Sequence, residues 1–138
     1  MRYLLDVSVL LAWGWTDHTL HERVIYWIEW TKGRRQTWLL TSAIPELGFV
    51  RISVQRTGGI ISVERATDVL RGMLGSLGNR HEFLADDLPS SGRWPGWCDN
   101  AAKTTDSHLL ALAEKHGAQL ATLDTGIPGA TLIPSVRP

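Results

Sequence analysis

Short apolar segments alternate with amphipathic helical segments along this chain, and that alternation constrains the fold more than any other feature. Strands are expected at 3–11, 37–40, 81–84 and 119–123, and helices at 17–30, 42–57, 62–77 and 104–116. Strands that alternate with helices form a parallel sheet through right-handed crossovers. The pattern therefore predicts an α/β fold with helices on both faces of the sheet.

Length and composition set the broad class of the protein. A chain of 138 residues with 43% hydrophobic residues can bury one core, so we expect a single domain over 1–138. The single cysteine, Cys98, excludes an intrachain disulfide and fits a reducing environment. The first apolar run is interrupted at Asp6, and no run approaches the roughly 18 apolar residues of a membrane span. We expect a cytoplasmic protein that does not bind membranes.

Four acidic residues lie where the predicted elements place a ligand site. Asp6 and Asp124 belong to the carboxyl ends of strands, whereas Glu46 and Asp106 lie in first turns of helices. Ligands of open α/β sheets bind beyond the carboxyl ends of the strands. Acidic residues in first turns also complement the helix dipole, so Glu46 and Asp106 alone say little. Asp6 says more, because a carboxylate inside a buried apolar strand is costly unless it is paired or bound to a cation.

Four neighbouring carboxylates predict a metal ion. Without a cation they would repel and raise one another's pKa, and a hard divalent ion such as Mg²⁺ or Mn²⁺ removes that conflict with oxygen ligands. Ser8 could orient one of them. A metal ion in such a pocket can promote phosphodiester hydrolysis, although the sequence leaves open whether one ion or two would act.

Four segments of the chain resemble PIN-domain ribonucleases, and within them VapC-type toxins. They are Leu5-Asp6-Val7-Ser8-Val9-Leu10-Leu11, Thr41 to Arg51, Thr105-Asp106-Ser107-His108 with the apolar helix that follows, and Leu120-Ala121-Thr122-Leu123-Asp124. The resemblance spans nearly the whole chain. It places the family's acidic site on Asp6, Glu46, Asp106 and Asp124, with Ser8 and Thr105 as polar supports.

The resemblance also implies an architecture and an activity. The architecture is a PIN-like three-layer sandwich with four or five parallel strands. The activity is Mg²⁺- or Mn²⁺-dependent endonucleolytic cleavage of RNA, by the toxin of a bacterial toxin–antitoxin pair that forms a homodimer and is neutralised by a cognate antitoxin protein.

Three alternatives remain open. One is a PIN nuclease of RNA processing, or a related DNA nuclease, outside any toxin–antitoxin pair. Another is a PIN-like module that binds RNA or protein without cutting it, which the intact set of carboxylates disfavours. The third is a haloacid-dehalogenase-like phosphatase or receiver domain, but these need a second aspartate two residues after the first, where this chain has Ser8.

A long segment rich in Gly, Pro and Ser, residues 86–103, is expected to be mostly loop. Its portion 92–103 carries Arg93, Trp94, Trp97 and Lys103, which suit contact with single-stranded RNA. Equally, the two tryptophans could only pack the loop onto the body of the protein. His108 and His116, on the helix that follows, are expected to be surface or capping groups.

Overall fold

All strands of the structure belong to one parallel sheet, and β1, the first strand of the chain, lies at its centre. The computed structural model describes residues 1–135. The order of the strands is β3-β2-β1-β4-β5, and every neighbouring pair is parallel. Their bounds are β1 Arg2–Leu5, β2 Trp38–Thr41, β3 His81–Phe83, β4 Gln119–Thr122 and β5 Thr131–Leu132.

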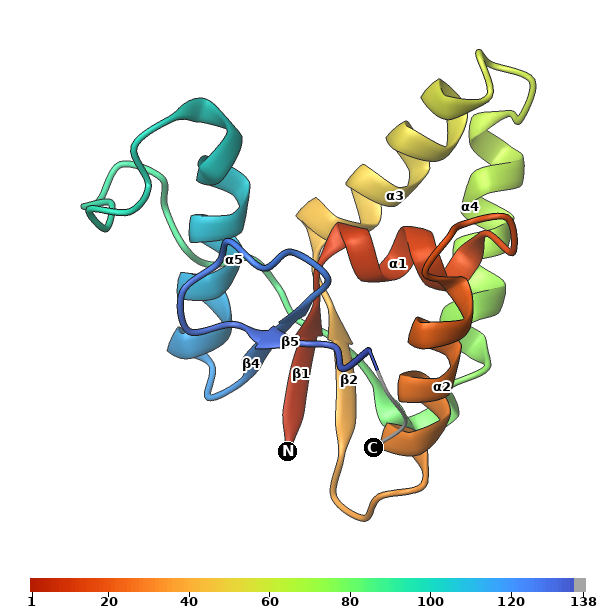
Figure 1. Ribbon diagram of the computed structural model, residues 1–138, viewed down its shortest axis with the longest axis horizontal. Helices are drawn as coiled ribbons and strands as arrows, with labels where there is room; N and C mark the ends of the chain where they lie inside the picture. The colour runs from red at the N-terminus through yellow and green to blue at the C-terminus, as the bar shows by residue number, and fades with distance from the viewer. Residues whose placement is uncertain (136–138) are drawn as a thin grey trace.

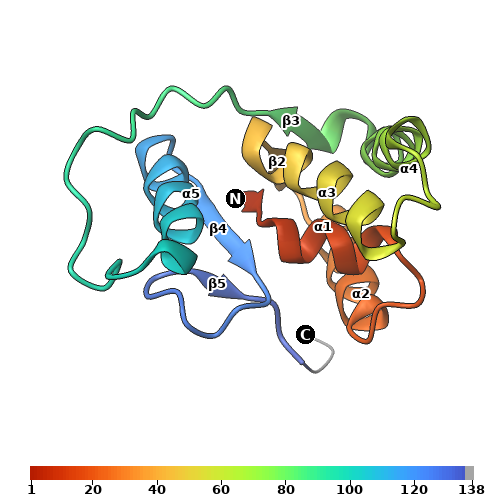
Figure 2. The same cartoon turned by 90° about the horizontal axis from the view of Figure 1, so that it is seen from above.

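Helices cover both faces of this sheet. Figures 1 and 2 show α5 on one face, with α1 and α2 on the other beside the hairpin of α3 and α4. The bounds are α1 Val7–Gly14, α2 His21–Lys32, α3 Ala43–Arg56, α4 Val63–Gly75 and α5 Thr104–Lys115, with short 3₁₀ turns at Gly78–Arg80 and Ala101–Lys103. The predicted α/β three-layer sandwich is confirmed.

Neighbouring residues of the central strand serve opposite faces of the sheet. Leu4 packs into the core beneath α5, together with Leu40 and Leu120. Leu5 packs into the larger core beneath α1 and α2. Because side chains alternate across a strand, a strand buried on both faces must be apolar throughout. This explains why β1 shows a continuous apolar run rather than alternation of polar and apolar residues.

The prediction that the first strand continues to residue 11 is wrong. The strand ends at Leu5, and Asp6 is the N-cap of α1, with its Oδ1 accepting a hydrogen bond of 2.7 Å from the Val7 amide. The helix α1 is itself embedded in the core, with Val9, Leu10 and Ala12 fully buried. A helix that is apolar all round has no polar stripe, so its residues resemble the continuation of a buried strand.

The remaining elements follow the predicted order with small shifts. Ser62 caps α4 as expected, and Gly117, with φ of +66°, follows the end of α5. The helix predicted to start at Asp17 starts at His21, and the Asp17 carboxylate forms an ion pair with Arg56. The two-residue strand β5 was not predicted. No helix within residues 1–135 is long and apolar enough to cross a membrane.

Candidate active site

Asp6 lies at the carboxyl end of the central strand and is almost completely buried, with 3% of its surface exposed. Its backbone amide still pairs with Ala121 of β4 at 3.0 Å, and the chain then turns into α1. Its Oδ2 accepts hydrogen bonds from the hydroxyls of Thr122, at 2.8 Å, and Ser8, at 3.3 Å. Burial nevertheless raises the pKa of Asp6, with a smaller contribution from the Asp124 carboxylate. Removal from water therefore outweighs the hydrogen bonds.

Asp106 and Asp124 join Asp6 at this edge of the sheet. Asp106 is half-buried in the first turn of α5, and Asp124 is exposed just after β4. Burial, together with the negative charges of Asp6 and Asp124, raises the pKa of Asp106 to about 6. The structure thus brings three of the four predicted site residues into electrostatic contact.

Glu46 lies at the same edge but its carboxylate is directed elsewhere. It accepts a hydrogen bond of 2.6 Å from the Thr41 hydroxyl, at the end of β2. The His81 Nε2 lies 2.7 Å from the same hydroxyl. Because that hydroxyl has only one proton and gives it to Glu46, His81 must be the donor in the second contact. Burial lowers the pKa of His81, while the charges of Glu46 and Glu82 oppose that shift.

The four candidate carboxylates have no cationic partner. None of them forms an ion pair with a Lys, Arg or His side chain anywhere in residues 1–135. In the same part of the chain, no three His, Cys, Asp or Glu side chains stand where they could hold a metal ion without rearranging. Within residues 1–135, these carboxylates therefore form no ion pair that would offset their charge.

The polar groups around Asp6 differ from those that were predicted. Ser8 supports Asp6 as expected and also accepts a hydrogen bond of 3.3 Å from the Leu123 amide. Thr122 was missed, although it makes the shorter bond to Asp6 and accepts one of 3.0 Å from the Asp124 amide. Thr105 is exposed and bonds to none of the four carboxylates among the described residues, so its supporting role stays a prediction.

A close approach of two helices holds the edge together. A Cβ added at Gly48, two residues after Glu46, would lie 2.9 Å from Cγ2 of Val7, which follows Asp6. Real Cβ atoms do not come so close to another carbon, so only glycine lets α3 approach α1 here. Gly48 thereby sets the distance between the segments that carry Asp6 and Glu46.

Comparison with known proteins shows which protein family this chain belongs to. No protein-family model matches it. It is 36% identical over 132 residues to Ribonuclease VapC39 of Mycobacterium tuberculosis, which covers 92% of this chain and 91% of that protein. It is 38% identical over 140 residues to Ribonuclease VapC44 of the same species, a match that covers 95% of each protein. It is also 34% identical over 129 residues to Ribonuclease VapC38, a match that covers 90% of this chain and 86% of that protein. The resemblance inferred from the motifs is thus confirmed, and this chain belongs to the VapC family of ribonucleases.

Proposed function

We propose that this protein is a metal-dependent endoribonuclease and the toxin of a toxin–antitoxin pair. The observation that carries the proposal is the grouping of Asp6, Asp106 and Asp124, whose mutual repulsion contributes to the raised pKa of Asp106. The relatives named ribonucleases, which match the chain over nearly its whole length, support RNA as the substrate.

The donor set of the pocket fits a hard divalent ion. Mg²⁺ and Mn²⁺ prefer carboxylate oxygens, and Mg²⁺ takes one or two of them directly while keeping several waters. Asp6, Asp106 and Asp124 would hold the ion once their side chains move closer together, and Glu46 would join them after its carboxylate leaves Thr41. Such an ion supplies an activated water near neutral pH and neutralises charge that develops on the phosphoryl group.

The protein's own groups prepare this pocket. The Val7 amide and the hydroxyls of Ser8 and Thr122 fix both oxygens of Asp6, so its orientation does not depend on the ligand. The Gly126 amide donates a hydrogen bond of 2.7 Å to Asp124 Oδ1, which orients the second carboxylate. Fixed donors and acceptors lower the cost of organising a site during reaction.

Exposed apolar side chains support a protein partner. Leu47 on α3 is 67% exposed, and Ile60 and Val63, at the turn into α4, are 90% and 62% exposed. Figure 1 shows the α3–α4 hairpin projecting past the end of the sheet. Exposed apolar side chains that form a patch mark a protein interface, and Ile60 and Val63 lie three residues apart at the turn into α4. An antitoxin, a second copy of this chain in a homodimer, or both would cover this hairpin.

Cleavage of labelled RNA tests the activity. The purified protein, freed from any partner, is incubated with total RNA in Mg²⁺, in Mn²⁺ and in EDTA. Discrete fragments should form only with metal, and Asp6→Asn and Asp106→Asn should reduce the rate at least a hundredfold, because each removes a charge from the metal site.

Asp68→Asn is the matched control. Asp68 is exposed on α4 and pairs with Arg71, so the same chemical change there should leave cleavage unaltered. If wild type, Asp6→Asn and Asp68→Asn all cut RNA equally, the activity comes from a contaminant and the acidic pocket is not a nuclease site. A pure wild-type protein that cuts nothing in either metal would favour a non-catalytic binding module.

Growth of a bacterial host tests the toxin role. Induced expression of the wild type should stop growth, whereas expression of Asp6→Asn should not, because arrest requires cleavage. Asp68→Asn should arrest growth like the wild type. Equal growth of cells expressing wild type and Asp6→Asn, at equal protein levels, would argue for a nuclease outside a toxin–antitoxin pair.

A further inference from the structure

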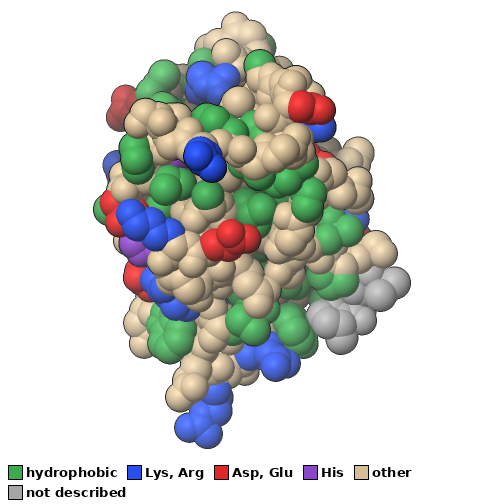
Figure 3. Space-filling view, turned by 90° about the vertical axis from the view of Figure 1, so that its left-hand side faces the viewer, with side chains coloured by type: hydrophobic (Ala, Val, Ile, Leu, Met, Phe, Trp, Pro, Cys, Tyr) green, Lys and Arg blue, Asp and Glu red, His purple; other side chains and the backbone are tan. Residues whose placement is uncertain are grey.

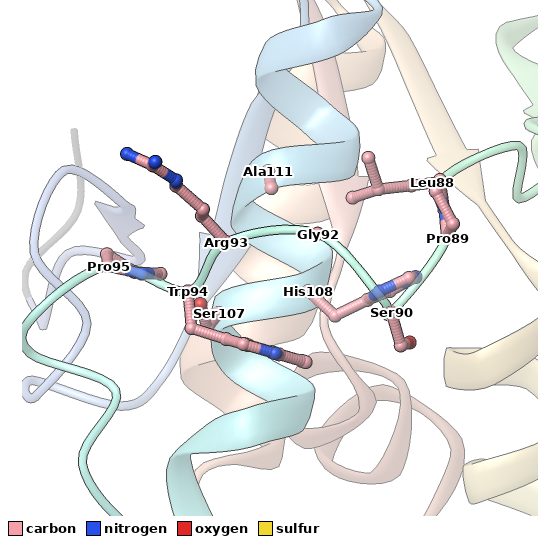
Figure 4. Close-up of a pocket in the computed structure, with 10 residues that line it drawn as sticks. All are labelled: Leu88, Pro89, Ser90, Gly92, Arg93, Trp94, Pro95, Ser107, His108 and Ala111. Carbon is pink, nitrogen blue, oxygen red and sulfur yellow. The ribbon is translucent and has the colours of Figure 1, made fainter.

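Two hollows flank the loop that crosses the outer face of α5. The first, of about 220 Å³, lies between Trp94 and His108, and the second, of about 460 Å³, extends from Trp94 to Glu114 and Pro128. The larger volume falls within the range of roughly 300–1,000 Å³ typical of ligand pockets. Figure 4 shows the Trp94 side chain lying across α5 beside Ser107, while Arg93 extends outward from the loop.

Two histidines anchor this loop at its base. His108 Nε2 lies 2.6 Å from Asp86 Oδ2, and His116 Nε2 lies 2.7 Å from Asp87 Oδ1. His108 is buried, with 8% of its surface exposed, which corrects its predicted place on the surface. The Asp86 carboxylate also accepts a bond of 3.2 Å from the Leu88 amide, where the loop begins. The loop is therefore held against α5.

The side chains around the hollows suit a nucleobase better than a phosphate. Trp94 is 41% exposed and offers a flat aromatic face. Arg93 supplies donors, Glu114 a carboxylate acceptor, and the Ser107 side chain lines both hollows. Glu114 would repel a phosphate, whereas a base has a flat face together with donor and acceptor groups along its edge. Unpaired bases are bound by stacking on aromatic side chains and by hydrogen bonds to their edges.

Two residues that line the hollows are near the acidic residues in the sequence. Ser107, which lines both, directly follows Asp106 on α5. Pro128, at the far end of the larger one, belongs to the same connection between β4 and β5 as Asp124. Figure 3 shows this side of the molecule, where hydrophobic side chains are interspersed with both basic and acidic ones. The hollows thus share α5 with Asp106 and the β4–β5 connection with Asp124.

We propose that the hollows beside Trp94 bind an unpaired base of the RNA next to the bond that the acidic pocket cleaves. This inference rests on the proposed function and assigns Trp94 and Arg93 to substrate recognition. Trp94 stacks on the base, and Arg93 and Glu114 contact its edge or the adjoining ribose. The loop then decides which sequence is cut, and the carboxylates perform the cutting.

Binding measured without cleavage tests this subsite. The probe is a fluorescein-labelled pool of random-sequence RNA decanucleotides in EDTA, followed by fluorescence anisotropy, with the integrity of the strand checked on a gel. Trp94→Ala should weaken binding about tenfold, as expected for loss of one stacked base, and Trp94→Phe should retain most of the affinity. With metal present, the bases flanking the cuts in total RNA should be less restricted for Trp94→Ala than for wild type.

Trp30 and Arg34 provide the matched control. The Arg34 guanidinium lies 4.6 Å from the centre of the Trp30 ring. Trp30 is in the last turn of α2, away from the ends of the strands that carry the acidic residues. Trp30→Ala, with its fold verified by circular dichroism, should bind the RNA pool like the wild type. Equal affinity of Trp94→Ala and wild type, equal losses in both tryptophan variants, or no binding by wild type would overturn the subsite.

The two proposals fail separately. Cleavage that needs metal and Asp6, together with binding and cleavage patterns unaffected by Trp94→Ala, would overturn the subsite alone. Binding that depends on Trp94, in a protein that cuts no RNA, would overturn the nuclease assignment and leave an RNA-binding site at the loop.

Discussion

At the scale of single residues, Asp6 both caps a helix and contributes to the acidic pocket. One oxygen accepts the Val7 amide, and the other accepts two hydroxyls. These bonds stabilise the ionised form, yet burial still raises its pKa. The residue is thus held in position while its charge is left incompletely compensated. A bound cation would offset that remaining cost.

Thr122 controls how well Asp6 is held. Thr122→Val removes the hydroxyl that donates to Asp6 and accepts from the Asp124 amide. A buried group left without its partner costs about 1–3 kcal/mol, so the free energy of unfolding should fall by that amount. Cleavage should slow as Asp6 loses its orientation. Urea denaturation and RNA cleavage measure both effects, and Thr122→Ser, which keeps the hydroxyl, should restore both. Equal defects in Val and Ser variants would contradict the role of the hydroxyl.

Asp106 gives the metal-free protein a pH dependence. Its pKa is about 6 in the folded state, above the ordinary value of 3.8. As pH rises through this interval, the unfolded chain ionises first and the folded protein must ionise at a cost, so its contribution to stability is lost. Unfolding in urea with EDTA should show wild type losing stability between about pH 4 and pH 6, and Asp106→Asn losing less. Identical slopes would mean that the carboxylates do not interact as described.

At the scale of elements, the contact of α1 with α3 depends on a missing side chain. Gly48→Ala would place a methyl group 2.9 Å from Val7 Cγ2 and force the two helices apart. Overpacking of this kind costs about 1–3 kcal/mol. Thermal unfolding should show the loss, and cleavage should fall because Asp6 and Glu46 are displaced. Gly72→Ala is the control, since nothing lies within 4 Å of its added Cβ in α4, and it should stabilise by up to about 1 kcal/mol.

The sequence predicted the order of the helices and strands better than the type and bounds of individual elements. Glycine stops located the ends of α3, α4 and α5, and the Ser62 cap located the start of α4, because those signals are local. The N-cap residues of α3 and α5, Ser42 and Lys103, make no side-chain capping bond. The helix α1 was misassigned because nearly all its residues are apolar, and none is exposed, so its sequence lacks a polar face with helical periodicity. The strand β5 was missed because two residues carry no recognisable pattern, and it pairs only with β4, which lies earlier in the chain.

The candidate site could be predicted only in part, because some of its residues are placed by the sheet topology and others by contacts between distant segments. Asp6, Asp106 and Asp124 follow or begin regular elements, so the sheet topology brings them together. The contacts of Thr122 with Asp6 and of His81 with Thr41 join residues far apart in sequence, and no spacing rule connects them. Burial of His108 likewise depends on Asp86, which reaches it from the loop.

At the scale of the whole molecule, metal binding should stabilise the fold. A ligand present at a hundredfold excess over its Kd stabilises by about 2.7 kcal/mol. Adding Mg²⁺ should therefore raise the unfolding temperature of wild type and of Asp68→Asn, but not of Asp6→Asn. The shift should be larger at pH 8 than at pH 5, because protons compete with the ion for Asp106. Equal shifts in wild type and Asp6→Asn would exclude the acidic pocket as the metal site.

The central position of β1 also determines when the acidic residues can assemble during synthesis of the chain. Asp6 is synthesised before β4, which begins at Gln119, so β1 cannot complete its pairing until β4 has been made. A translation product interrupted earlier lacks both Asp124 and the strand that positions it. A chain that stops before Gln119 should therefore lack the assembled site and cut no RNA.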